Sequence, residues 1–122
     1  MRWVLHGPLT AAVADALRRH GHDPRAADEL KLPDDASPRD IFKAAQSKQL
    51  DVVTADAALV NAIFEEKINF NRSVVFLQLE GGDVEQDDAV DRLFKRYKRL
   101  SPGRLYTVTG SRVKVRQLPG RN

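Results

Sequence analysis

Short runs of apolar residues alternate along most of the chain with segments in which apolar side chains recur every three or four positions. Residues 3–5 form the first such run, and the apolar positions over residues 9–17 then follow a helical period. This pattern predicts a strand followed by an amphipathic helix that ends near Gly21, with Pro8 as its first residue. A second short strand is expected within residues 22–26.

The same alternation continues through the middle of the chain. Ser37 precedes a proline and an acidic residue, which is typical of a helix N-cap, and the helix is expected to run to about Lys48. Residues 51–54 form a compact apolar run that predicts a buried strand. Asp56 then precedes another helical period that continues through Phe64.

The C-terminal part of the chain has a different order of predicted elements and ends in two consecutive strands. Residues 73–79 predict a strand, and the apolar stripe over residues 90–97 predicts a long helix. Residues 105–109 and 112–117 are two alternating runs. They are joined by a two-residue loop that begins with Gly110, which predicts a β-hairpin with a type II′ turn.

Length and composition indicate one soluble domain over residues 1–122. Of the 122 residues, 42% are hydrophobic and 30% charged, as in ordinary globular proteins. Repeated strand–helix alternation followed by one hairpin predicts a three-layer α/β domain with a mainly parallel central sheet and an antiparallel C-terminal edge. Cysteine is absent from the sequence, which excludes disulfides, thiolate metal sites and cysteine nucleophiles.

The expected location is the cytoplasm, without a membrane partner. No apolar stretch of the sequence approaches the roughly 20 residues that span a bilayer. The N-terminus leads straight into the first predicted strand without the apolar region of a secretory signal.

The net charge of +3 conceals a strong asymmetry. Residues 1–91 contain all 17 acidic residues and 10 lysines and arginines, whereas residues 92–122 contain the other 10 basic residues and no acidic one. Three interpretations of this basic block remain open: a surface that faces nucleic-acid phosphates, a complement to an acidic partner, or a solvated face.

Alternation in the last predicted strand places its basic side chains on one face. Three cations there alternate with two valines, so the valines are expected to face the core while the cations line one surface. Together with cations of the preceding helix, this surface is a candidate RNA-binding face; protection of an exposed sheet edge is the alternative. The candidate RNA-binding residues are Arg112, Lys114, Arg116, Lys95, Lys98 and Arg99.

Two acidic residues are candidates for a metal site. Ligand crevices of open parallel sheets lie at the carboxyl ends of the strands. Asp56 follows one predicted strand, and Asp40, in the first turn of the helix before that strand, can face the same crevice. Carboxylates that converge there would suit Mg²⁺ or Mn²⁺. The alternative is that Asp40 is a capping-box acid and Asp56 an N-cap.

The three histidines differ in their expected roles. His6 ends the first strand, where it suits a ligand, a general base, an RNA-stacking ring or a buried ring bonded to backbone. His20 and His22 lie beside arginines after the first helix, without an evident third ligand. They are expected to be a solvated pair.

The order and spacing of several segments resemble a compact bacterial and archaeal PIN-like family, related to nucleases of the VapC toxin type. The resemblance covers nearly the whole chain. The segments that carry it are Trp3–Leu9, Arg18–Asp23, Glu29–Leu32, Ala36–Ile41, Val52–Asp56, Pro102-Gly103 and Val113–Pro119. It implies a PIN-like fold with a metal-dependent ribonuclease site built from acidic residues at four places.

This sequence has acidic residues at two of those four places. The resemblance implies an aspartate at the end of the first strand, where His6 stands, and an acid in the turn that opens the second main helix, which matches Asp40. It also implies an aspartate after the Val-Val-Thr strand, which matches Asp56, and one two residues later, where Ala58 stands. Possible substitutes, if the loop folds inward, are Asp34, Asp35 and Asn61.

Two functions therefore remain open. One is a metal-dependent endoribonuclease, of the toxin type or another, with Asp40 and Asp56 as Mg²⁺ or Mn²⁺ ligands and His6 as an auxiliary ligand or base. The other is a PIN-like scaffold without catalysis that binds RNA or protein. The toxin relatives also imply a small antitoxin partner and self-association into a homo-oligomer.

Overall fold

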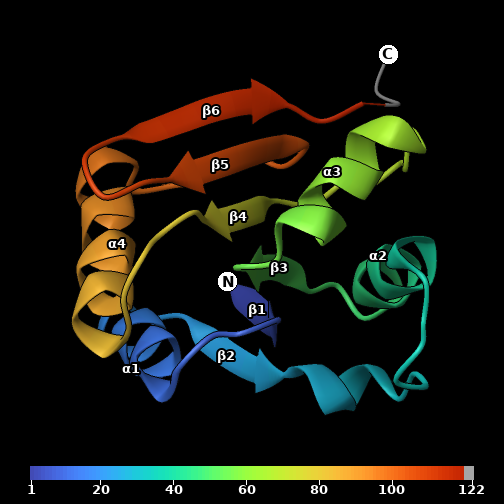
Figure 1. Ribbon diagram of the computed structural model, residues 1–122, viewed down its shortest axis with the longest axis horizontal. Coiled ribbons are helices and arrows are strands. Elements are labelled where there is room, and N and C mark those ends of the chain that lie inside the picture. Colours follow the sequence, from blue (N-terminus) through green and yellow to red (C-terminus); the bar gives the residue numbers. More distant parts are fainter. Residues whose placement is uncertain (120–122) are drawn as a thin grey trace.

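A six-stranded sheet with helices on both faces forms the centre of the structure (Figure 1). The structure is a computed structural model, and it describes residues 1–119. In chain order the elements are β1 (Arg2–His6), α1 (Ala11–Arg19), β2 (Asp23–Ala26), the 3₁₀ helix η1 (Ala27–Leu30), α2 (Pro38–Ser47), β3 (Asp51–Thr54), α3 (Ala57–Glu65), β4 (Val74–Leu77), α4 (Asp83–Arg96), β5 (Arg104–Val108) and β6 (Val113–Gln117). Among these residues, no helix has the length and apolar character needed to cross a membrane.

The strand order is β2-β1-β3-β4-β5-β6. Neighbouring strands from β2 to β5 are parallel, and β6 pairs with β5 in the antiparallel sense. The predicted α/β class, with a mainly parallel sheet and an antiparallel C-terminal pair, is confirmed. This topology places β6 at an edge of the sheet.

Two apolar cores hold the layers together, one on each face of the sheet. Alternation along the central strand β3 divides its side chains, with Val52 in one core and Val53 in the other. Helices α2 and α3 cover the first core, whereas α1 and α4 cover the second (Figure 1). All four residues of β3 are buried, as is expected for a strand covered by helices on both faces.

The first helix begins later than the sequence predicts. Pro8 is not its first residue; α1 starts at Ala11, with Thr10 as the N-cap whose hydroxyl accepts a hydrogen bond from the N–H of Ala12 (3.3 Å). The chain first turns at Gly7, which has a φ of +82°, and the Leu9 N–H donates to the Gly7 carbonyl (2.8 Å). Pro8 and Leu9, which the sequence places in the helix, therefore lie in this turn.

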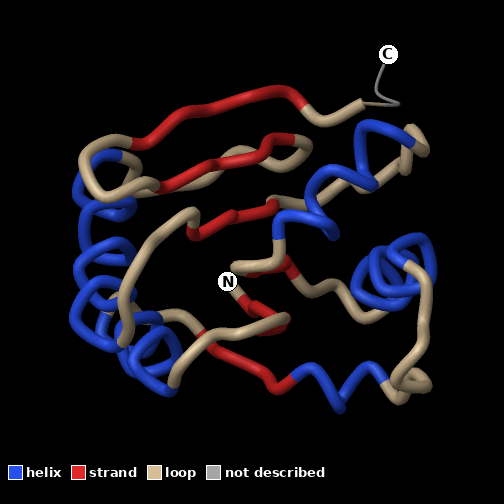
Figure 2. The backbone as a smooth tube through the Cα atoms, viewed as in Figure 1, coloured by secondary structure: helices blue, strands red, loops and turns tan. Residues whose placement is uncertain are grey.

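The C-terminal hairpin is confirmed, but its predicted turn type is wrong. A type II′ turn needs a positive φ at Gly110, and Gly110 is not among the glycines with that conformation. Instead the Thr109 N–H donates to the carbonyl of Arg112 (2.9 Å), and the Thr109 hydroxyl accepts from the Arg112 N–H (3.2 Å). A side chain therefore shapes this loop, which Figure 2 shows at the end of the sheet beside α4.

Candidate functional site

Four residues at the carboxyl ends of β1 and β3 form what we call the strand-end cluster: His6, Gly7, Thr54 and Asp56. Pairing of β1 with β3 sets His6 opposite Thr54, and the His6 Nδ1 lies 3.0 Å from the Thr54 hydroxyl. The same hydroxyl accepts a hydrogen bond from the Asp56 N–H (3.0 Å). A Cβ at Gly7 would lie 3.3 Å from the Asp56 Cβ, so glycine permits this close approach.

Burial makes the His6 ring harder to protonate. His6 is half-buried, and desolvation lowers its pKa below 6.5, although the negative charge of Asp56 partly opposes this shift. A neutral imidazole has one nitrogen that can accept a proton. The ring can therefore serve as a hydrogen-bond partner or proton acceptor at neutral pH.

Both predicted acidic ligands lie at helix N-termini. Asp56 is the N-cap of α3, because its Oδ1 accepts a hydrogen bond from the N–H of Ala58 (2.9 Å). Asp40 is exposed in the first turn of α2, and its N–H donates to the hydroxyl of the N-cap Ser37 (3.1 Å). The capping interpretation of Asp56 is thus confirmed, and Asp40 lies where its charge favours the helix dipole.

The donors at this edge of the sheet do not fit a preformed Mg²⁺ or Mn²⁺ centre. Over residues 1–119, no three His, Asp or Glu side chains gather closely enough to hold a metal ion. Mg²⁺ requires several oxygen ligands in near-octahedral geometry, usually including one or two carboxylates. At the strand-end cluster one carboxylate stands beside one imidazole, and that carboxylate already accepts the N-cap hydrogen bond of α3.

A pocket of about 290 Å³ opens beside His6. Asp34 lines it as well, so the loop before α2 brings one of the proposed substitute acids to the same pocket as this histidine. Asp35 is exposed, and Asn61 lines a different groove between α3 and β6. Of the three possible substitutes, only Asp34 lies at this pocket among the described residues.

His20 and His22 are half-buried and held by neighbours, so their description as a solvated pair is wrong. The His20 Nε2 lies 2.7 Å from an Asp91 carboxylate oxygen. The His22 ring stacks on Phe94 with centroids 4.5 Å apart, and its Nδ1 accepts a hydrogen bond from the Trp3 indole N–H (3.2 Å). Burial, followed by the charge of the N-terminus, lowers the pKa of His22. Sequence reasoning missed these contacts because they join the turn between α1 and β2 to β1 and to the distant helix α4.

The six predicted RNA-binding cations do not form one surface. Lys114 and Arg116 of β6 are exposed on the face that α3 covers, because Arg116 pairs with Leu105, a residue of the α2–α3 core. Lys95 is exposed on α4, which covers the opposite face of the sheet (Figure 1). Lys98 and Arg99 lie beyond the end of α4 rather than on it, and Arg112 is exposed in the hairpin loop.

The two valines of β6 differ in burial. Val113 packs against the α1–α4 core, as predicted, whereas Val115 remains 36% exposed. Because β6 is an edge strand, the sheet does not continue beyond it to enclose Val115.

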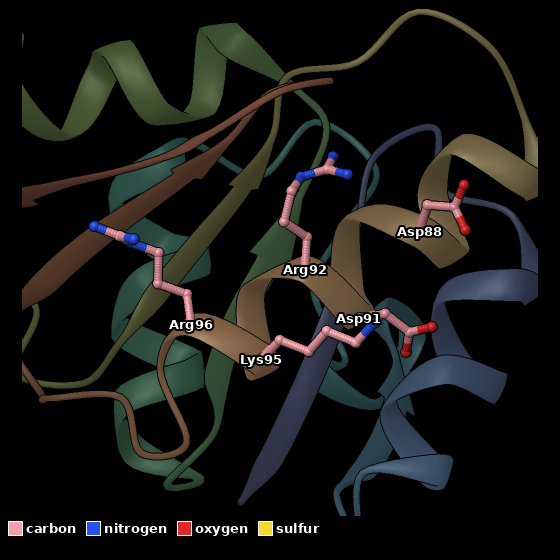
Figure 3. Close-up of a pocket in the computed structure, with 5 residues that line it drawn as sticks. All are labelled: Asp88, Asp91, Arg92, Lys95 and Arg96. Atoms are coloured by element: carbon pink, nitrogen blue, oxygen red, sulfur yellow. The ribbon is translucent and has the colours of Figure 1, made fainter.

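Lys95 lines an open hollow of about 740 Å³ on the outer side of α4. Figure 3 shows Asp88 and Asp91 projecting from the same stretch of helix as Arg92, Lys95 and Arg96. The Arg92 guanidinium also donates a hydrogen bond to the Thr109 carbonyl (2.6 Å), which ties the hairpin to α4. Acidic and basic groups thus line the same hollow, which weakens the attraction of this surface for phosphate.

Sequence reasoning missed two further features. Asp51 is buried at the start of β3, where its carboxylate accepts hydrogen bonds from the Ser73 N–H (2.8 Å) and Arg72 (3.3 Å). The Arg116 guanidinium lies 3.7 Å above the centre of the Phe64 ring. Neither feature has a local sequence signal, since each joins residues from separate elements.

Comparisons of the chain with protein-family models, with curated proteins and with solved structures find no match.

Proposed function

We propose that this chain is a PIN-like domain that binds RNA through the β6 edge of its sheet and does not depend on a metal ion to do so. The observation that carries the proposal is a contrast between its charged groups. The acidic candidates lie at the N-termini of two different helices, Asp40 in the first turn of α2 and Asp56 as the N-cap of α3. Lys114 and Arg116, in contrast, lie side by side on one face of an exposed strand.

The arrangement of the sheet supports the PIN-like part of the proposal. His6 and Asp56 follow β1 and β3, which are neighbours in the parallel sheet, and the Thr54 hydroxyl links them. Two positions of the acidic site implied by the family resemblance therefore do adjoin. With an imidazole at one of them, this cluster offers less negative charge to a divalent cation than a pair of aspartates would.

Electrostatics supports RNA as the partner. Lysine and arginine supply most of the affinity of proteins for phosphate backbones. This contribution weakens as the salt concentration rises, because the release of condensed counterions from the RNA is then less favourable. Cations on β6 also discourage pairing with the edge strands of other chains. That protective role predicts the same exposed charges without RNA affinity, so a binding measurement separates the two interpretations.

The experiment is a fluorescence-anisotropy titration of a labelled single-stranded RNA in EDTA. The test variant is Lys114→Gln with Arg116→Gln, which removes two charges but keeps most of each side-chain stem. The control is Lys43→Gln with Lys48→Gln, two exposed lysines of α2 and its C-cap. We expect the wild type and the control to bind alike and the test variant to bind more weakly.

Three outcomes would overturn the proposal. They are no binding by the wild type, an equal loss in the control, and RNA binding that disappears in EDTA. Binding of an acidic antitoxin-like protein or self-association, with no RNA binding, would assign the basic edge to a protein partner instead.

A further inference from the structure

A groove of about 430 Å³ runs between α3 and the β6 edge of the sheet. We call it the α3–β6 groove. Its walls come from α3 on one side and β6 on the other, and side chains of β4 and β5 form its floor. Its volume falls within the range of about 300–1,000 Å³ that is typical of small-ligand sites.

The lining of the α3–β6 groove combines three kinds of side chain. Phe64 and Phe76 contribute aromatic rings, and the exposed Asn61 and Gln78 contribute amide groups. Lys114 and Arg116 contribute positive charge. All of its lining residues are apolar, neutral polar or basic. The hollow on α4 in Figure 3 differs, because Asp88 and Asp91 line it as well.

These three kinds of group match the parts of an unpaired nucleotide. Single-stranded RNA is recognised by stacking of exposed bases on aromatic rings or arginine guanidinium planes, and by hydrogen bonds to the base edges. An amide side chain both donates and accepts, so it can bond to a base edge. Lysine supplies a charge for an adjacent phosphate.

Contact between Arg116 and Phe64 gives the groove its stacking surface. The guanidinium carbon lies 3.7 Å above the centre of the half-buried Phe64 ring, and Arg116 itself is exposed. A cation–π contact of this kind orients the guanidinium plane. A base can stack on the solvent side of that plane, or on the ring if Arg116 swings away toward a phosphate.

We propose that the α3–β6 groove takes an unpaired base of single-stranded RNA, with Phe64 and Arg116 as the stacking pair and Lys114 beside the neighbouring phosphate. The inference rests on the proposed RNA binding and adds a preference for unpaired over duplex RNA. Bases in a duplex are stacked within the helix and cannot enter a groove of this kind.

The test compares one labelled RNA as a single strand and as a duplex, with the wild type and Phe64→Leu. Leucine keeps an apolar side chain on α3 but removes the aromatic face. Tyr97→Leu is the matched control, because Tyr97 is also a half-buried ring with an arginine over it, at 5.8 Å from Arg96, on the other face of the sheet. Thermal midpoints of all three proteins establish that they are folded.

We expect Phe64→Leu to weaken single-strand binding by about 5- to 150-fold, the range for loss of one base–aromatic stack. Duplex binding by Phe64→Leu, and both affinities of Tyr97→Leu, should remain near wild type. As a second measurement on the wild type, photocrosslinking of RNA that contains 4-thiouridine should label peptides from α3 or β6.

The outcomes separate this inference from the proposed function. If the wild type binds RNA but Phe64→Leu retains its single-strand affinity, or if the crosslinks fall only outside α3 and β6, the groove is not the base site while RNA binding stands. If the wild type binds neither form of RNA, the proposed function itself fails, and the groove assignment fails with it.

Discussion

Replacing Asp51 should destabilise the protein far more than replacing an exposed aspartate. Asp51 is 2% exposed at the start of the central strand β3, and it accepts hydrogen bonds from the Ser73 N–H (2.8 Å) and from Arg72 (3.3 Å). Asp51→Ala removes both acceptors. The N–H of Ser73, a residue that is 1% exposed, is then left without its partner.

Magnitudes for the two lost contacts can be assigned separately. Leaving a buried N–H unsatisfied costs about 1–3 kcal/mol. The Arg72 side chain is 32% exposed and keeps contact with water, so loss of its ion pair adds at most about 1 kcal/mol. We therefore expect Asp51→Ala to lower the free energy of unfolding by about 1–4 kcal/mol. For a domain of this size, the thermal midpoint should fall by roughly 4–16 °C.

Asp51→Asn separates the hydrogen bond from the charge. Its amide oxygen can still accept from Ser73, and burial raises the pKa of Asp51, which means that the site disfavours the charged form. We expect this variant to lose less than about 1 kcal/mol. The exposed Asp23, which pairs with Arg25 at 2.7 Å, provides the control Asp23→Ala.

Urea unfolding followed by circular dichroism, together with thermal scans, measures these differences. A midpoint for Asp51→Ala equal to that of Asp23→Ala would refute the reasoning. So would an Asp51→Asn variant as unstable as Asp51→Ala, because the loss would then not come from the hydrogen bond to Ser73.

Two further predictions concern His22 and Gly7. Burial lowers the pKa of His22, so as the pH falls below about 6.5 the unfolded state binds a proton at this residue more readily than the folded state does. The contribution of neutral His22 to stability is therefore complete above about pH 6.5 and is lost below that. Urea unfolding at pH 7.5 and pH 5 should show a smaller loss on acidification for His22→Gln than for the wild type; equal losses would contradict this. Gly7→Ala should cost about 1–2 kcal/mol for its left-handed backbone, and more than Gly21→Ala, because both glycines have positive φ but only Gly7 lies against Asp56. Equal midpoints for the two alanine variants would show that the strand-end cluster tolerates a Cβ.

Most of the fold could be predicted because periodicity is a local property of the sequence. The buried run at residues 51–54 and the cap pattern at Ser37 each correspond to the observed element, since backbone geometry and capping act within a few residues. The start of α1 was misplaced because Thr10 caps the helix with support from Gln86, whose side chain accepts from the Thr10 N–H at 2.9 Å. That support comes from α4, which is distant in the sequence.

The candidate site was less predictable because side-chain contacts depend on how the layers pack. Alternation along β6 correctly placed Lys114 and Arg116 on one face of the strand, but nothing in the sequence near Lys95 shows that α4 covers the other face of the sheet. For the same reason, the sequence does not predict the contact of Arg116 with Phe64 or the burial of His22 beside Phe94. Each of these contacts joins residues far apart in the chain.

The salt dependence of single-stranded RNA binding tests the central claim most directly. Each phosphate contact contributes a slope of about 0.7 to a plot of log affinity against log salt for single strands. Lys114 lies beside a phosphate, and Arg116 reaches a second one only when it swings away from Phe64. Lys114→Gln with Arg116→Gln should therefore reduce the slope by about 0.7–1.4 in EDTA, while Lys43→Gln with Lys48→Gln leaves it unchanged. An unchanged slope in the Lys114 and Arg116 variant would contradict the account, because the β6 edge would then not contact the RNA backbone.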